Sequence, residues 1–166
     1  MEENLRKLML AMIVYNNGDA KRIQHFIKVH ALAKLIGEEE KMDAQALYIL
    51  EAAALTHDIG IRNSEKKYGT CTGKQQELEG PPEAEKLLRS LGFDGGVVNR
   101  VCWLVAHHHT YNNIDALDYR ILVEADFLVN LYEDGATTDA VKIAYERIFK
   151  TEAGRKICRV MYGLPE

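Results

Sequence analysis

Residues 49–60 read Ile-Leu-Glu-Ala-Ala-Ala-Leu-Thr-His-Asp-Ile-Gly, and this stretch decides how the rest of the chain is interpreted. Its first eight residues are apolar on nearly every face of a helix, which is typical of a helix buried on all sides. His57 and Asp58 follow where that helix ends. Burying an imidazole and a carboxylate is costly unless both are paired. We therefore expect a divalent metal ion to pair with both groups.

The composition fits one globular domain over residues 1–166. The chain is 47% hydrophobic and has three prolines, so it can bury a full core without disulfide bonds or structural metal ions to stabilise it. Its three cysteines form no Cys-x-x-Cys pair, which disfavours a disulfide framework or a thiolate zinc site and indicates a cytoplasmic protein. We see no secretory leader and no apolar run of the ~20 residues needed to span a bilayer. The net charge of −4 argues against long nucleic acids as partners.

The apolar spacing is helical almost everywhere, which predicts an all-α bundle of about seven to eight helices. The expected helices cover residues 3–15, 20–36, 44–57, 83–91, 94 to the histidines at 107–109, 117–132, 138–149 and 152–161. Residues 61–79 are polar and are predicted to form a long loop that acts as a mobile lid. Gly80-Pro81-Pro82 is interpreted as the point where helical structure restarts.

Two further side chains are candidates for the same metal. His25 lies within an expected helix, and Asp126 interrupts the apolar run Ile-Leu-Val-Glu-Ala-Asp-Phe-Leu-Val. A buried carboxylate needs a strong partner. Imidazole nitrogens and carboxylate oxygens from separate helices can converge on one ion and leave positions open for substrate, as catalytic sites do. His30 is about 140° around the helix from His25 and is expected to point elsewhere.

Three segments, taken together and in order, resemble the HD-domain metal-dependent phosphohydrolases, whose signature is H…HD…D. They are Arg22-Ile-Gln-His25-Phe-Ile-Lys-Val29, Ala53-Ala-Leu-Thr-His57-Asp58-Ile-Gly60 and Glu124-Ala-Asp126. The resemblance covers about residues 20–132. It implies an HD-type helical bundle in which a metal-bound water attacks a phosphate ester. It also implies the metal ligands His25, His57, Asp58 and Asp126, with Asp58 as the catalytic residue that orients or deprotonates the water.

The sequence departs from parts of this family. Relatives with two metals carry a further His where alignment on Gly80 places Gln76, so one ion is favoured over two. Relatives that act on cyclic dinucleotides carry a Lys where this chain has Ile61, so that activity is not assigned. His107 and His108 are possible additional metal ligands or substrate-facing groups, and Glu77 and Glu79 are further possible ligands. His109 is expected to face solvent or cap a carbonyl.

Positive charge for a phosphorylated substrate is expected from two places. Arg22 lies three residues before His25 and can bind a phosphoryl oxygen bidentately. The predicted lid carries Arg62, Lys66, Lys67 and Lys74. Mn, Fe, Co, Ni, Mg and Zn all suit the proposed donor set.

The leading hypothesis is a phosphohydrolase that acts on a nucleotide or another small phosphorylated metabolite. Two alternatives remain open. One is a nonheme di-iron oxygenase on the same scaffold, which needs two irons and which Gln76 disfavours. The other is a non-catalytic regulatory module that binds a nucleotide without turning it over.

Overall fold

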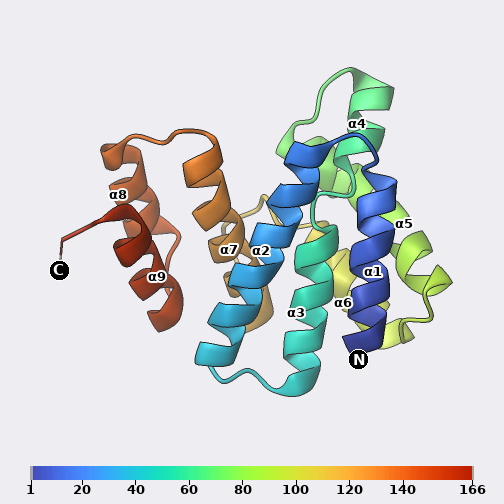
Figure 1. The fold of residues 1–166 in the computed structure, drawn as a ribbon, viewed down its shortest axis with the longest axis horizontal. Helices are drawn as coiled ribbons and strands as arrows, with labels where there is room; N and C mark the ends of the chain where they lie inside the picture. The colour runs from blue at the N-terminus through green and yellow to red at the C-terminus, as the bar shows by residue number, and fades with distance from the viewer. Residues whose placement is uncertain (1, 166) are drawn as a thin grey trace.

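The computed structural model describes residues 2–165, and within them the chain folds into nine α-helices with no strand (Figure 1). The all-α prediction is confirmed. The helices are α1 (Glu2–Tyr15), α2 (Ala20–Glu39), α3 (Ala44–Thr56), α4 (Ile61–Tyr68), α5 (Gly73–Ser90), α6 (Gly95–Val105), α7 (Leu117–Glu133), α8 (Thr138–Arg147) and α9 (Glu152–Tyr162). In this part of the chain, no helix is both long and apolar enough to cross a membrane.

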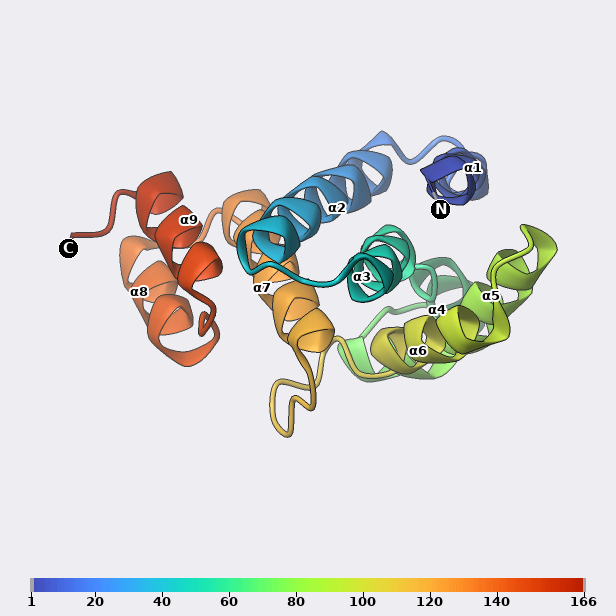
Figure 2. The ribbon, with the colours of Figure 1, turned by 90° about the horizontal axis from the view of Figure 1, so that it is seen from below.

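Helix α3 is the centre of the bundle. Every residue from Leu50 to His57 is buried, as its uninterrupted apolar character predicts. Figure 2 shows α3 with α1 and α2 on one side and α4, α5 and α6 on the other, while α7 lies beside α2 and α3. The two polar groups inside α3 are paired, since Thr56 Oγ1 donates to the Ala52 carbonyl at 2.8 Å and Glu51 Oε2 lies 2.9 Å from His30 Nε2. The side chains at the end of α3 are thereby held in the interior.

The prediction that residues 61–79 form a loop is wrong. Helix α4 occupies residues 61–68, and α5 begins at Gly73. Thr72 and Gln75 form a capping box, which satisfies backbone donors at the start of α5. Ser64 is the one buried residue of α4. Because so little of α4 is buried, its sequence is polar although it is a helix. The described residues therefore contain nine helices, one more than the eight that we expected.

Gly80-Pro81-Pro82 does not begin a helix but lies inside α5. Gly80 is buried against the turn after α3, where a Cβ on Gly60 would come within 2.7 Å of the Gly80 nitrogen and of the Gln76 carbonyl oxygen. The two glycines therefore allow α5 to approach the backbone next to Asp58. The prolines lack N–H groups, which breaks the hydrogen-bond ladder of α5 but does not end the helix.

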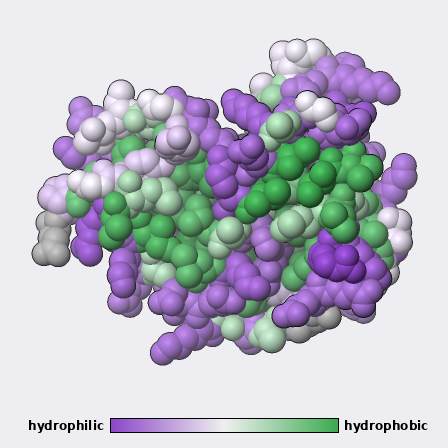
Figure 3. All heavy atoms as spheres, in the orientation of Figure 1, coloured by the Kyte–Doolittle hydropathy of each residue, from purple (hydrophilic) through white to green (hydrophobic). Residues whose placement is uncertain are grey.

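Helix α9 packs on the outer side of α2 and α7, and α8 packs against α9 (Figure 1). The fully buried Glu124 of α7 accepts hydrogen bonds from the backbone of Lys150 at 2.6 Å and of Thr151 at 3.0 Å, just before α9. Hydrophobic atoms are exposed over part of this face (Figure 3), where Leu35, Val160 and Met161 line a groove between α2 and α9. The polar candidate site lies outside this groove.

Candidate metal centre

The four predicted metal ligands meet in space, although they come from α2, the end of α3 and α7. His25 Nε2 lies 3.2 Å from both His57 Nε2 and Asp126 Oδ1, and 3.4 Å from Asp58 Oδ2. His57 Nε2 lies 3.5 Å from the same two carboxylate oxygens. We call these four residues the HD cluster. The donor atoms of His25, His57 and Asp58 all lie within 4.8 Å of one another, and Asp126 contacts both histidines.

Local structure explains why these side chains converge. His25 and Asp126 lie on the buried faces of α2 and α7, two helices that pack against each other and against α3. His57 is the C-terminal cap residue of α3, and Asp58 starts the turn beyond it. The fold thus positions two ligands by helix packing and two by the end of a buried helix.

Hydrogen bonds behind the HD cluster orient its members. His57 Nδ1 donates to the Ala54 carbonyl at 2.8 Å, so its Nε2 is free to face the cluster. His25 Nδ1 lies 2.9 Å from Glu133 Oε2. Asn130 Nδ2 donates to Asp126 Oδ1 at 2.8 Å. Both imidazoles therefore present Nε2 to the same centre.

The charges of the HD cluster suit a divalent cation. Burial opposes protonation of His57, but the Asp58 and Asp126 carboxylates outweigh it and raise its pKa to about 9. Burial alone would raise the pKa of both aspartates, yet the neighbouring histidines hold them well below the usual range. The two ionised carboxylates are thus balanced by the protonated His57 ring, a role that a divalent cation would take over. Two nitrogen and two oxygen donors fit the borderline divalent metals.

A second group of possible ligands shares Asp58. The donor atoms of Asp58, His108 and His109 lie within 4.8 Å of one another, and we call these residues the second donor group. His108 Nε2 lies 3.6 Å from Asp58 Oδ1 and is buried without a hydrogen-bond partner among residues 2–165. His108 Nδ1 donates to the Val105 carbonyl at 2.8 Å. The unpartnered nitrogen therefore faces the site and fits a role toward metal, water or substrate.

The expectation that His109 faces solvent is wrong. Its side chain is partly buried, and its Nε2 lies 3.0 Å from Gln76 Oε1. Burial, helped by the nearby His108, lowers the pKa of His109 to about 4 and keeps the ring neutral. Glu77 Oε1 fixes the turn by accepting from the His109 backbone N–H at 3.0 Å and from the Thr110 hydroxyl at 2.9 Å.

Two other predicted candidates lie apart from the HD cluster. His107 stacks on Trp103 with 4.1 Å between ring centroids, and its Nδ1 donates to the Trp103 carbonyl at 2.7 Å. Glu79 is 2.8 Å from Lys67 Nζ and accepts from the Tyr68 hydroxyl at 2.7 Å. The structure therefore brings His108, but not His107, to the site.

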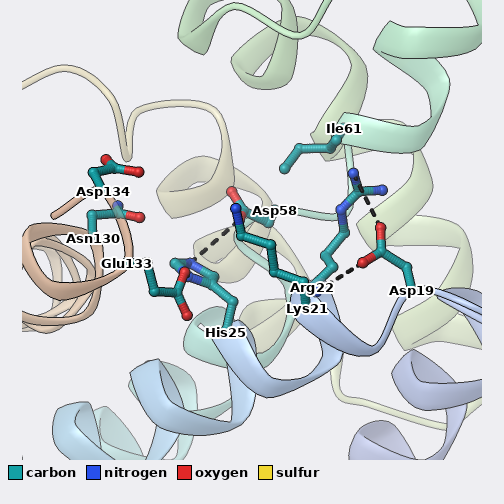
Figure 4. Close-up of a pocket in the computed structure, with 9 residues that line it drawn as sticks. All are labelled: Asp19, Lys21, Arg22, His25, Asp58, Ile61, Asn130, Glu133 and Asp134. Carbon is teal, nitrogen blue, oxygen red and sulfur yellow. Dashed lines mark hydrogen bonds and ion pairs between the residues drawn. The ribbon is translucent and has the colours of Figure 1, made fainter.

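A cavity of about 220 Å³ opens beside the HD cluster (Figure 4). Its lining includes Arg22, whose Nη2 lies 3.1 Å from Glu65 Oε1 and 3.4 Å from Asp19 Oδ2. Lys21 also lines it and was missed from the sequence, where it carried no motif. The full lining is Asp19, Lys21, Arg22, His25, Asp58, Ile61, Asn130, Glu133 and Asp134.

The three predicted substrate-binding cations downstream of Gly60 are not part of this lining. Arg62 turns toward α1, where it donates to the Tyr15 carbonyl at 2.5 Å and lies 5.5 Å from the centre of the Tyr15 ring. Lys66 and Lys74 are exposed to solvent. Because this segment is helical, its basic side chains are distributed around helix surfaces and are not gathered over the site.

Comparisons with known proteins agree with this geometry. The model of the HD domain family matches residues 22–150. No curated protein matches the chain significantly. A solved structure described as a predicted HD superfamily hydrolase from an uncultured Thermotogales bacterium superposes with a TM-score of 0.69 at 28% identity, over 95% of this chain and 84% of that one. The chain belongs to the HD domain family.

Proposed function

We propose that this protein is a metal-dependent phosphohydrolase that cleaves a phosphate ester or anhydride in a nucleotide or another small phosphorylated molecule. The observation that carries the proposal is the convergence of His25, His57, Asp58 and Asp126 beside an open cavity that also contains Arg22. The cavity has a volume of about 220 Å³, and the basic side chains of Lys21 and Arg22 line it.

The HD cluster would hold one divalent cation, and Mn, Fe, Co, Ni, Mg and Zn all suit its donors. Such a cation lowers the pKa of a coordinated water toward ~7 and stabilises negative charge on phosphoryl oxygens. One ion is favoured because Gln76 stands where two-metal relatives carry a further His. Its amide oxygen already engages His109 Nε2 at 3.0 Å.

The remaining steps fall to side chains of the chain itself. Asp58 presents Oδ2 to the HD cluster and Oδ1 toward His108, so its ionised carboxylate can orient the attacking water and accept its proton. His108 Nε2 can then take that proton and return it to the leaving oxygen. Arg22 can bind a nonbridging phosphoryl oxygen once substrate competes with Glu65 for its guanidinium.

Metal content and phosphate release test this proposal together. The purified protein is stripped of metal, reloaded with each of the six cations, and assayed with p-nitrophenyl phosphate and with nucleoside mono-, di- and triphosphates. We expect about one metal ion per chain and metal-dependent phosphate release that His57→Ala abolishes. Absence of metal binding or unchanged turnover in His57→Ala would overturn the proposal. Two irons with oxygen uptake would identify an oxygenase, and a retained nucleotide without turnover would identify a regulatory module.

A further inference from the structure

We propose that Glu133 is a positioning residue that fixes the orientation and tautomer of His25, so that His25 can bind the metal. This inference rests on the proposed metal-dependent function and adds a residue outside the H…HD…D signature. Glu133 is the last residue of α7, seven positions after Asp126. Seven residues are about two helical turns, so both carboxylates lie on the same side of α7. One helix therefore supplies both a ligand and the group behind another ligand.

Each oxygen of the Glu133 carboxylate has its own partner on α2. Oε2 lies 2.9 Å from His25 Nδ1, and Oε1 lies 2.6 Å from Lys28 Nζ. The side chain of Glu133 is only 12% exposed, and Figure 4 shows it beside the His25 ring. The Lys28 ammonium and the His25 ring thus fix the direction of both carboxylate oxygens, which makes Glu133 an acceptor held in one orientation.

Because this carboxylate already accepts from the Lys28 ammonium, the hydrogen of its bond to the ring comes from His25 Nδ1. The Nε2 atom, which lies 3.2 Å from Asp126 Oδ1, is then the one left to bind the metal. Carboxylates behind metal-binding histidines orient the ring and increase its basicity, and their loss typically lowers metal affinity 10- to 100-fold. Glu133 meets the geometric requirement for this role.

The position of each histidine explains why only His25 needs such a partner. His57 caps the end of α3, where carbonyls of the last turn have no helical partner, and its Nδ1 donates to the Ala54 carbonyl. His25 is the sixth residue of a 20-residue helix, so nearby carbonyls are used by the helix itself. An acceptor for its Nδ1 must come from another element, and Glu133 provides it.

Calorimetric titration of the metal-free protein with Mn²⁺ tests this inference. We expect Glu133→Ala to weaken Mn²⁺ binding about 10- to 100-fold. Glu133→Gln retains an acceptor oxygen and should recover most of that loss. The matched control is Asp134→Asn, which removes one negative charge from the same cavity without touching His25 and should leave the Mn²⁺ affinity within about twofold. Lys28→Met tests the ion pair alone, and we expect a loss of less than about fivefold.

Kinetics with p-nitrophenyl phosphate separate this role from substrate contact. At saturating Mn²⁺, Glu133→Ala should retain the wild-type KM. A raised KM with unchanged Mn²⁺ affinity would place Glu133 on the substrate and overturn the inference.

An equal loss of Mn²⁺ affinity in Lys28→Met would assign the effect to the ion pair between α2 and α7 and also overturn it. If wild type itself binds no Mn²⁺, the proposed function fails and the inference fails with it. Unfolding of the metal-free variants shows whether each one is folded. If Glu133→Ala is not, Glu133→Leu replaces it, because it fills the same space without an acceptor and should show the same loss of Mn²⁺ affinity, about 10- to 100-fold.

Discussion

The HD cluster and the second donor group share Asp58 but are built differently. In the HD cluster, both nitrogens of His25 and of His57 have partners, and the ligands come from helices that pack around α3. In the second donor group, His108 Nε2 has no hydrogen-bond partner within residues 2–165, and His109 Nε2 is engaged by Gln76. The first arrangement is suited to holding a cation. The second is suited to exchanging protons or contacting substrate.

Removal of Asp58 should have the largest effect, because it is the one residue common to both groups. We expect Asp58→Ala to abolish Mn²⁺ binding in calorimetry and to lower phosphate release by about 10³-fold or more. Asp58→Asn keeps the side-chain shape but removes the charge, so it should fail in the same way. Retention of Mn²⁺ binding by both variants would show that the HD cluster does not depend on this carboxylate.

His108 separates the two groups. We expect His108→Ala to lower turnover by about 100-fold while the Mn²⁺ affinity stays within about threefold, because His108 lies outside the HD cluster. The neighbouring His107 is the matched control, since it stacks on Trp103 away from the site, and His107→Gln should change turnover by less than about twofold. A large loss of Mn²⁺ affinity in His108→Ala would instead make His108 a ligand.

The HD cluster could be predicted from the sequence because its four residues match the ordered H…HD…D signature, and three of them also carry local signals. His57 and Asp58 end an apolar helix, and Asp126 interrupts one. The second donor group was predicted only in part, because His108 was a candidate whereas His109 was expected to face solvent or cap a carbonyl. Helix α6 stops at Val105, and the turn that follows brings His108 and His109 back to the site. That turn depends on Glu77, which lies 32 residues earlier in the chain.

The same limit explains the other missed features. Glu133 meets His25 across 108 residues, so no spacing rule connects them. Residues 61–79 are polar, and for that reason we expected a loop. Their polar character reflects the solvent exposure of a helix and not the absence of one. We assigned Arg62, Lys66 and Lys74 to a mobile lid. Because the segment is helical, the fold does not form that loop. Local sequence patterns predicted the buried helices. The residues around the HD cluster depend on contacts between distant segments, which local patterns do not show.

Gly60 lies between the HD cluster and α5, and its substitution tests how much the stability of the fold depends on this close approach. A Cβ there would meet the Gln76 carbonyl oxygen and the Gly80 nitrogen at 2.7 Å, and both are backbone atoms. We expect Gly60→Ala to lower the free energy of unfolding by about 1 to 3 kcal/mol, the usual cost of overpacking. Chemical denaturation measures this change. Gly95→Ala is the control, because a Cβ there meets nothing within 4 Å, and it should be neutral or slightly stabilising.

Gln76→His would convert the second donor group toward a full metal site and should have the smallest effect on turnover. The new imidazole would stand beside His109, where Gln76 Oε1 now lies 3.0 Å from Nε2. With His108 and Asp58, the group would then offer three nitrogens and one carboxylate, a sufficient set for a second borderline cation. We expect elemental analysis to give nearly two metal ions per chain in this variant and about one in wild type, with turnover within about tenfold of wild type. A ratio of two in both proteins would show that Gln76 does not limit the site, and a ratio of one in both would show that the second donor group serves protons and substrate alone.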